Sequence, residues 1–252
     1  MLQICVRKGA LAPAIFCLLM GLSTPGHAGP SDYVLTPTVE QGEKEIDFKA
    51  GTSKARDGSR LNKESIGFGY GVTSSWFSEV YAIWHKEPGD RHGFDAWEWE
   101  NKFQLTETGK YALDVGMVLE IERPKNRKEG WEVVWGALLQ KELTSTVQAN
   151  LNVLFSRQFH AQDSTTTELG YQWQVKYRWR PELEFGVQGF GALGPWRHWS
   201  DSSGQSHVVG PAVFGKLRVG ANQHVKYNAA LLVGQGSGSP RSTLRMQAEY
   251  EF

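Results

Sequence analysis

The sequence ends in STLRMQAEYEF, residues 242–252, and this stretch decides the fold. Small or apolar residues occupy every second position from Ser242 to Phe252, and every position between them is polar or charged. A period of two is that of a β-strand with one apolar face. Chain termini of soluble proteins are usually polar and frayed. An alternation that continues to a terminal aromatic residue is therefore unusual for a soluble protein.

This C-terminal segment resembles the closing strand of bacterial outer-membrane β-barrel proteins, which typically end in such an alternating stretch with a terminal Phe. The resemblance identifies a type of fold and no narrower family. It implies a Gram-negative outer-membrane location, with membrane lipid and the barrel assembly machinery as partners. It also implies that Tyr250 and Phe252 belong to the signal that this machinery reads.

The beginning of the chain resembles a secretory signal peptide. Arg7 and Lys8 precede an apolar run over residues 10–22, and the small residues at 26–28 suit a cleavage site after Ala28. Removal of residues 1–28 takes away both cysteines, so the sequence predicts neither a disulfide nor thiol chemistry. It also leaves 25 basic and 27 acidic side chains, a balance that does not favour nucleic-acid binding.

Period-two segments fill most of the remaining chain, and a mean hydropathy of −0.42 excludes helical membrane spans, which need about 20 apolar residues each. Twelve strands are predicted, at 42–52, 61–73, 75–86, 93–106, 110–122, 130–143, 146–159, 167–179, 182–194, 208–218, 224–234 and 242–252. Each has the roughly 9 to 11 residues that a tilted transmembrane strand requires. No segment shows a sustained helical period, so no helix is expected.

The connections between these segments alternate between short and long, as in outer-membrane barrels. The sequence therefore predicts an all-β fold: a twelve-stranded antiparallel up-and-down transmembrane β-barrel over residues 42–252. Short turns on one side place both termini in the periplasm. Residues 29–41, with Pro30 and Pro37, are expected to form a periplasmic N-terminal lead-in without regular structure. A soluble β-sandwich would also alternate, but the uniform apolar bands at residues 111–121 and 169–179 favour a lipid-facing surface.

Charged residues at the strand positions that alternate with the apolar, lipid-facing ones are predicted to face the lumen. The acidic ones lie toward the external mouth, and they are Glu98, Glu100, Glu120, Glu122 and Glu132. The basic ones lie on the far wall, mostly toward the periplasm, and they are Lys176, Arg178, Lys216, Arg218, Lys226 and Arg245. Either these groups pair with one another and with nearby amide side chains to fill the barrel, or they face each other across water and select a passing solute.

The sequence favours a narrow porin-like channel for a small polar or charged solute, with no enzymatic step, cofactor or metal. A closed structural or assembly barrel is the first alternative. A lipid-acting hydrolase is the second, because His198 and Ser200 have the His-x-Ser spacing of lipid A deacylases and the outer-membrane phospholipase. The absence of a following Asn and of a downstream carboxylate argues against it. The scattered histidines lack the spacing of metal ligands.

Overall fold

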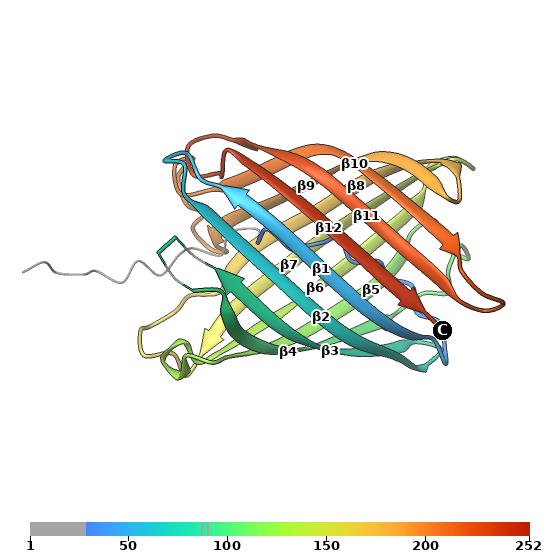
Figure 1. Ribbon diagram of the computed structural model, residues 1–252, viewed down its shortest axis with the longest axis horizontal. Coiled ribbons are helices and arrows are strands. Elements are labelled where there is room, and N and C mark those ends of the chain that lie inside the picture. The colour runs from blue at the N-terminus through green and yellow to red at the C-terminus, as the bar shows by residue number, and fades with distance from the viewer. Residues whose placement is uncertain (1–28, 87, 90) are drawn as a thin grey trace, which may run out of the picture.

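The computed structural model describes residues 29–86, 88–89 and 91–252, so the predicted signal peptide lies outside the described residues. Twelve strands form a closed barrel (Figure 1). They are β1 (Lys44–Lys54), β2 (Arg60–Thr73), β3 (Trp76–Lys86), β4 (Gly93–Gln104), β5 (Asp114–Pro124), β6 (Trp131–Glu142), β7 (Val147–Phe159), β8 (Glu168–Arg180), β9 (Leu183–Pro195), β10 (Ser206–Arg218), β11 (His224–Gln235) and β12 (Ser242–Glu251).

Each strand pairs antiparallel with the next one along the chain, and β12 pairs with β1 to close the sheet. In that closing pair Ile46 lies opposite Tyr250, and Phe48 lies opposite Ala248. Closure leaves no strand edge unpaired, which a spanning β-structure requires. The predicted fold is therefore confirmed. Within the described residues, no helix is long and apolar enough to cross a membrane.

Two local predictions were wrong. Strand β5 begins at Asp114 instead of residue 110, because the Asp114 carboxylate accepts a 2.7 Å hydrogen bond from the backbone N–H of Gly109 and holds the turn open. A short 3₁₀ helix, η1 (Arg127–Glu129), occupies the loop after β5, where no helix was expected. The Asn126 side chain accepts a hydrogen bond from the backbone N–H of Lys128 and so caps η1.

The outward face of the barrel carries large apolar side chains that remain exposed. Phe68, Val80, Leu151 and Leu231 are all at least 45% exposed on this face. Aromatic pairs lie near its ends, such as Trp76 with Phe103. This distribution is that of an apolar band with aromatic girdles.

The two ends of the barrel differ. We call the end that carries the short connections, the start of β1 and Phe252 the turn end, and the opposite end the loop end. The loop over residues 196–205 lies against the β11–β12 loop, since Gln205 and Ser203 closely approach Gly238.

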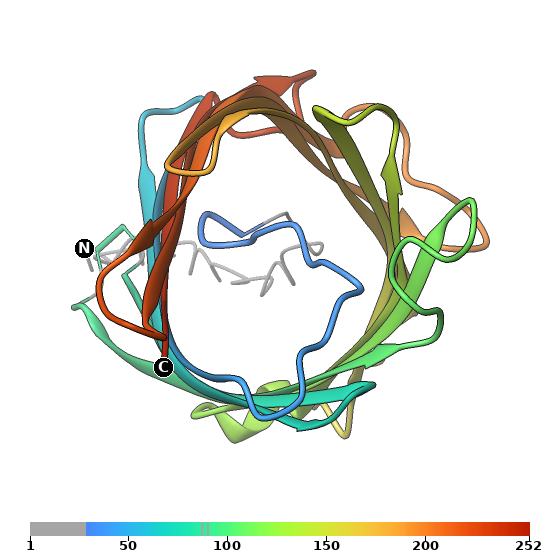
Figure 2. The ribbon, with the colours of Figure 1, turned by 90° about the vertical axis from the view of Figure 1, so that its right-hand side faces the viewer.

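Residues 29–43 run through the inside of the barrel, and we call them the plug segment (Figure 2). They enter at the turn end, where the Gly42 N–H donates a hydrogen bond to the Gly71 carbonyl and the Gly71 N–H donates to the Glu43 carbonyl. They reach the loop half, where Pro30 lies beside Gly51. The expectation of a lead-in outside the barrel at residues 29–41 is therefore corrected. Inward-facing glycines make the room: a Cβ atom at Gly51, Gly71 or Gly116 would overlap the plug segment.

Candidate functional site

Two consecutive apolar side chains anchor the plug segment to opposite walls of the lumen. Val34 packs with Phe190 and Val208 on the β9–β11 side, whereas Leu35 packs with Val118 and Leu138 on β5 and β6. Successive side chains of an extended chain point in opposite directions, so one short stretch can contact both walls. Val34 is 7% exposed and Leu35 is 2% exposed, so the segment fills the middle of the barrel.

Polar contacts fix the same segment. The Tyr33 hydroxyl donates a 2.7 Å hydrogen bond to Oε2 of Glu100. The side-chain amide of Asn152 donates to the Leu35 carbonyl at 3.0 Å, and the Val39 N–H donates to Oε1 of Gln104 at 2.8 Å. These bonds pair buried polar groups that would otherwise lose their water partners. The plug segment is therefore bound to the walls of the barrel by both apolar and polar contacts.

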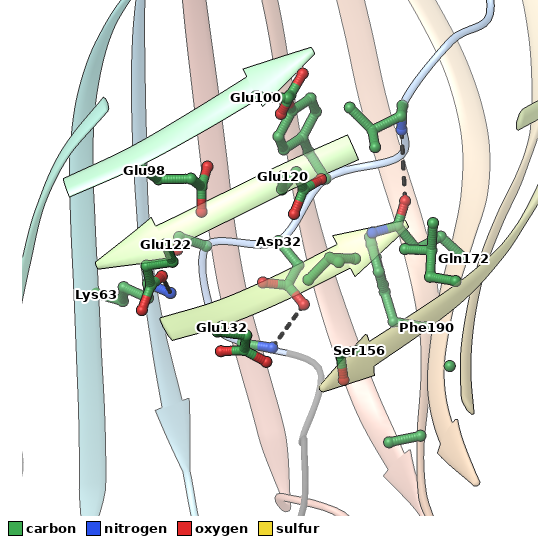
Figure 3. Close-up of a pocket in the computed structure, with 18 of the residues that line it drawn as sticks. Asp32, Lys63, Glu98, Glu100, Glu120, Glu122, Glu132, Ser156, Gln172 and Phe190 are labelled. Atoms are coloured by element: carbon green, nitrogen blue, oxygen red, sulfur yellow. Dashed lines mark hydrogen bonds and ion pairs between the residues drawn. The ribbon is translucent and has the colours of Figure 1, made fainter. Parts of the chain in front are cut away.

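On the loop side of the plug segment lies a chamber of about 240 Å³, which we call the loop-end chamber (Figure 3). The structure brings together here the whole acidic set predicted from the sequence. Its charged lining consists of Asp32, Glu98, Glu100, Glu120, Glu122, Glu132, Glu168, Lys49 and Lys63. Seven carboxylates thus face two ammonium groups, and the chamber is strongly acidic.

The two lysines neutralise only part of this charge. Lys63 lies 3.9 Å from Glu122, and Lys49 lies 3.5 Å from Asp47. The Lys49 ammonium is also held between the rings of Tyr33 and Tyr81, at 3.6 and 3.7 Å from their centroids.

Three acidic side chains of the chamber, by contrast, are unpaired in the described part of the chain. Glu98, Glu120 and Glu132 have neither a hydrogen bond nor an ion pair there. Each is partly exposed to the chamber rather than fully buried. Their carboxyl groups are therefore available to a solute or to water in the chamber.

A row of amide side chains crosses the lumen wall at mid-height. Hydrogen bonds of 3.0 Å join Asn150 to Gln140, Gln174 to Asn150, and Gln188 to Gln174. Arg245 on β12, only 2% exposed, extends the row by donating to Gln188. The predicted pairing of lumen charges with amides is thus observed for Arg245. It is not observed for the loop-end glutamates 98, 120 and 132.

On the turn side of the plug segment lies a second cavity of about 380 Å³, which we call the turn-end chamber. Lys176, Lys216 and Lys226 line it, as does Lys102. Most of these lysines are paired, unlike Glu98, Glu120 and Glu132 of the loop-end chamber. Lys176 lies 3.1 Å from Glu184, and Lys216 lies 2.9 Å from a carboxylate oxygen of β12. The remaining predicted cations lie at the turn-end rim, where Arg178 pairs with Glu142 and Arg218 donates to turn carbonyls.

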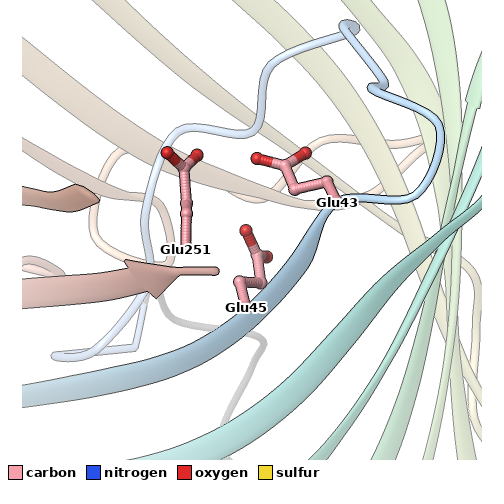
Figure 4. Close-up of side chains that lie close together, drawn as sticks. All are labelled: Glu43, Glu45 and Glu251. Carbon is pink, nitrogen blue, oxygen red and sulfur yellow. The ribbon is translucent and has the colours of Figure 1, made fainter. Parts of the chain in front are cut away.

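Three carboxylates beside the turn-end chamber, those of Glu43, Glu45 and Glu251, approach within 4.8 Å of one another (Figure 4). Such a group resembles a cation site. Lys226, however, contacts both Glu43, at 3.4 Å, and Glu251. The lysine side chains of the barrel therefore supply the countercharge for this group.

The residues proposed for hydrolysis do not form a catalytic arrangement. His198 is exposed, and within the described residues no hydrogen bond joins its ring to Ser200 or Asp201. The Asp201 carboxylate instead accepts hydrogen bonds from Ser203 and from the Gly204 N–H, and so closes a loop turn. A nucleophile needs its base within hydrogen-bonding reach. The geometry therefore indicates that residues 198–201 serve to shape the loop and not to catalyse hydrolysis.

Sequence reasoning missed Asp32 and Tyr33, because residues 29–41 were expected outside the barrel. It also missed Lys49 and Lys63. Both lysines lie at lumen-facing positions of β1 and β2, and this alternation could have identified them as lumen residues. An apolar run at residues 33–35 within a polar stretch was the available sign that the lead-in packs against something.

Comparisons with known proteins agree on the fold. The COG4313 outer membrane channel from Pseudomonas putida F1 superposes with a TM-score of 0.58 at 12% identity, over 88% of this chain and 99% of that one. The NanC porin gives a TM-score of 0.56 at 10% identity, over 82% and 98%. The KdgM porin in complex with disordered oligogalacturonate gives 0.54 at 7% identity, also over 82% and 98%.

No family model matches the sequence, and no curated protein matches it either. The structural likeness, at 12% identity or less, shows the architecture alone. The chain is a twelve-stranded antiparallel β-barrel of the Gram-negative outer-membrane type.

Proposed function

We propose that this protein is a narrow outer-membrane channel for small charged solutes, and that the plug segment controls its opening. One observation supports this most strongly. Two charged chambers lie in the lumen, one on each side of the plug segment. Tyr33 lines both chambers, so its displacement would join them.

The charges of the chambers support an ordered passage. The loop-end chamber carries an excess of carboxylates, and the turn-end chamber carries lysines that are mostly paired. Fixed charges that line a narrow pore determine which ions enter it. The structural neighbours are a channel and two porins by name, which supports the same class of function.

A closed barrel is the second candidate, and the anchoring of the plug segment favours it. Val34 and Leu35 are buried on opposite walls, and the Asn152 amide donates a hydrogen bond to the Leu35 carbonyl. If these contacts never release, the barrel stays occluded and serves as a structural or assembly element. The two candidates differ only in whether the plug segment moves.

Planar lipid bilayers distinguish the two candidates. We expect discrete current steps from the purified protein, and a larger or more persistent conductance from a variant that lacks residues 30–39. Folding of both is checked by the heat-dependent mobility of the barrel in gel electrophoresis. If neither protein gives a current, although both are folded and inserted, the channel function is contradicted. The closed barrel then remains as the explanation.

A further inference from the structure

The loop-end chamber is lined by more acidic side chains than basic ones. Seven carboxylates line it against two lysines. Cleavage after Ala28 would add one α-ammonium group at Gly29, whose nitrogen lies 2.7 Å from Asp32 Oδ2. Carboxylates would still outnumber cations by seven to three. Unpaired charges of one sign in a confined space favour the entry of an ion of the opposite sign.

Glu100 gives an independent indication of a missing hydrogen-bond partner. Its side chain is 1% exposed, and its Oε2 accepts the hydrogen bond from Tyr33. Its Oε1 atom, equally buried, has no hydrogen-bond partner among the described residues. A buried carboxylate oxygen normally has a donor within reach, since burial without one is costly. The lining of the chamber therefore includes a buried carboxylate oxygen that the described residues leave without a donor.

The spacing of the carboxylates does not suit a metal ion. A Ca²⁺ ion needs 6 to 8 oxygen ligands at about 2.3 to 2.6 Å from one centre. Among the described residues, the glutamates of the loop-end chamber do not form a group whose oxygens lie within 4.8 Å of one another; only the Glu43, Glu45 and Glu251 group does. Glu98, Glu120 and Glu132 come from three successive strands and are spread along the wall (Figure 3). Several separated positive charges fit this wall better than one ion.

Apolar and aromatic surfaces lie among the acidic groups. Ile83, Val134 and Leu154 line the same chamber, together with the aromatic rings of Tyr33 and Phe190. Methylene groups lose unfavourable contact with water when they lie against such side chains. Aromatic faces also attract ammonium groups, as the position of Lys49 beside Tyr33 shows in this chamber.

We propose that the loop-end chamber binds a linear organic polycation, in which ammonium groups alternate with short methylene segments, as in a polyamine. The carboxylates of Glu98, Glu120 and Glu132 bind its ammonium groups, and the apolar side chains contact its methylene segments. This deepens the proposed function by naming the class of solute. Because Asp32 and Tyr33 of the plug segment line the chamber, the bound polycation also contacts the plug.

Titration calorimetry with spermidine on the full detergent-solubilised protein tests this inference. The test variant is Glu98→Gln, Glu120→Gln and Glu132→Gln together, which removes three charges and nearly preserves volume. The matched control removes three exposed loop carboxylates, at Asp57, Asp163 and Asp201, by replacement with Asn. Heat-dependent gel mobility checks that every variant is folded.

We expect spermidine to bind the wild-type protein and the loop control alike, and to bind the chamber variant at least about tenfold more weakly. Butylamine and Mg²⁺ should bind more weakly than spermidine to the wild type. Equal spermidine binding by the chamber variant, or tighter binding of Mg²⁺ than of spermidine, would overturn the inference. Calorimetry measures binding without a membrane current, so the two hypotheses can fail separately. If spermidine does not bind but the protein conducts in bilayers, only the polycation site is rejected. If spermidine binds but the bilayers show no current, only the channel function is rejected.

Discussion

Truncation of Leu35 should release the plug segment without unfolding the barrel. Leu35 is 2% exposed and packs against Val118 and Leu138, so Leu35→Ala removes a fully buried apolar group. Such a truncation costs about 2 to 5 kcal/mol in a protein core. The strands pair with one another independently of residue 35, so most of this cost is borne by the docked plug.

A loss of about 2 to 5 kcal/mol changes the ratio of docked to released plug by about 30-fold to about 4,000-fold. Single-channel recording in planar bilayers should show this change as a higher open probability for Leu35→Ala, with a similar current for each open event. Leu151→Ala is the matched control, because Leu151 is 45% exposed on the outward face of the neighbouring strand β7. An open probability equal to that of the wild type, in a folded Leu35→Ala protein, would refute the reasoning.

Three further predictions concern charge, topology and pH. Glu98→Gln with Glu120→Gln should lower the permeability ratio of cations over anions, measured by reversal potential, because fixed charges act over about 8 to 10 Å at ordinary salt. An unchanged ratio would contradict a role for these groups in selectivity. A cysteine at Ser202 should react with an impermeant thiol reagent on intact cells, and one at Thr108 should not, since these positions lie in a long loop and a short turn; the reverse result would invert the barrel. Burial, and then a hydrogen bond to a carboxyl group of β12, raise the pKa of Glu43 to about 7 from its ordinary 4.5. The stability that Glu43 contributes is present below its ordinary pKa of 4.5 and is lost as pH rises through about 7. The thermal midpoint of the wild type should therefore fall over this pH range, and Glu43→Gln should make that fall smaller. An equal fall in both proteins would exclude the raised pKa of Glu43.

The strands could be predicted from the sequence because each one alternates between lipid-facing and lumen-facing residues. That local pattern is enough to predict that the side chains of Glu98, Lys176 and Arg245 face the lumen. It locates the strand ends less well where a side chain reshapes the turn, as Asp114 does at the start of β5.

The position of the plug segment could not be predicted in the same way. Pro30 and Pro37 interrupt regular structure, so residues 29–41 have no period that indicates a partner. The apolar sites that receive Val34 and Leu35 lie on separate groups of strands, and they face each other only after the barrel has closed. The same holds for Lys49 and Lys63, whose place beside the acidic wall depends on closure rather than on neighbours in sequence.

A reversible bridge between the plug segment and the wall tests the central claim most directly. Val34 and Ala212 belong to one buried cluster, and with both native cysteines in the predicted signal peptide, Val34→Cys with Ala212→Cys can be joined by a short crosslinker that contains a disulfide. Single-channel current is then recorded before and after dithiothreitol. The account predicts silence while the bridge holds and discrete openings after reduction. Equal conductance in the bridged and reduced states would show that the plug segment does not close the lumen.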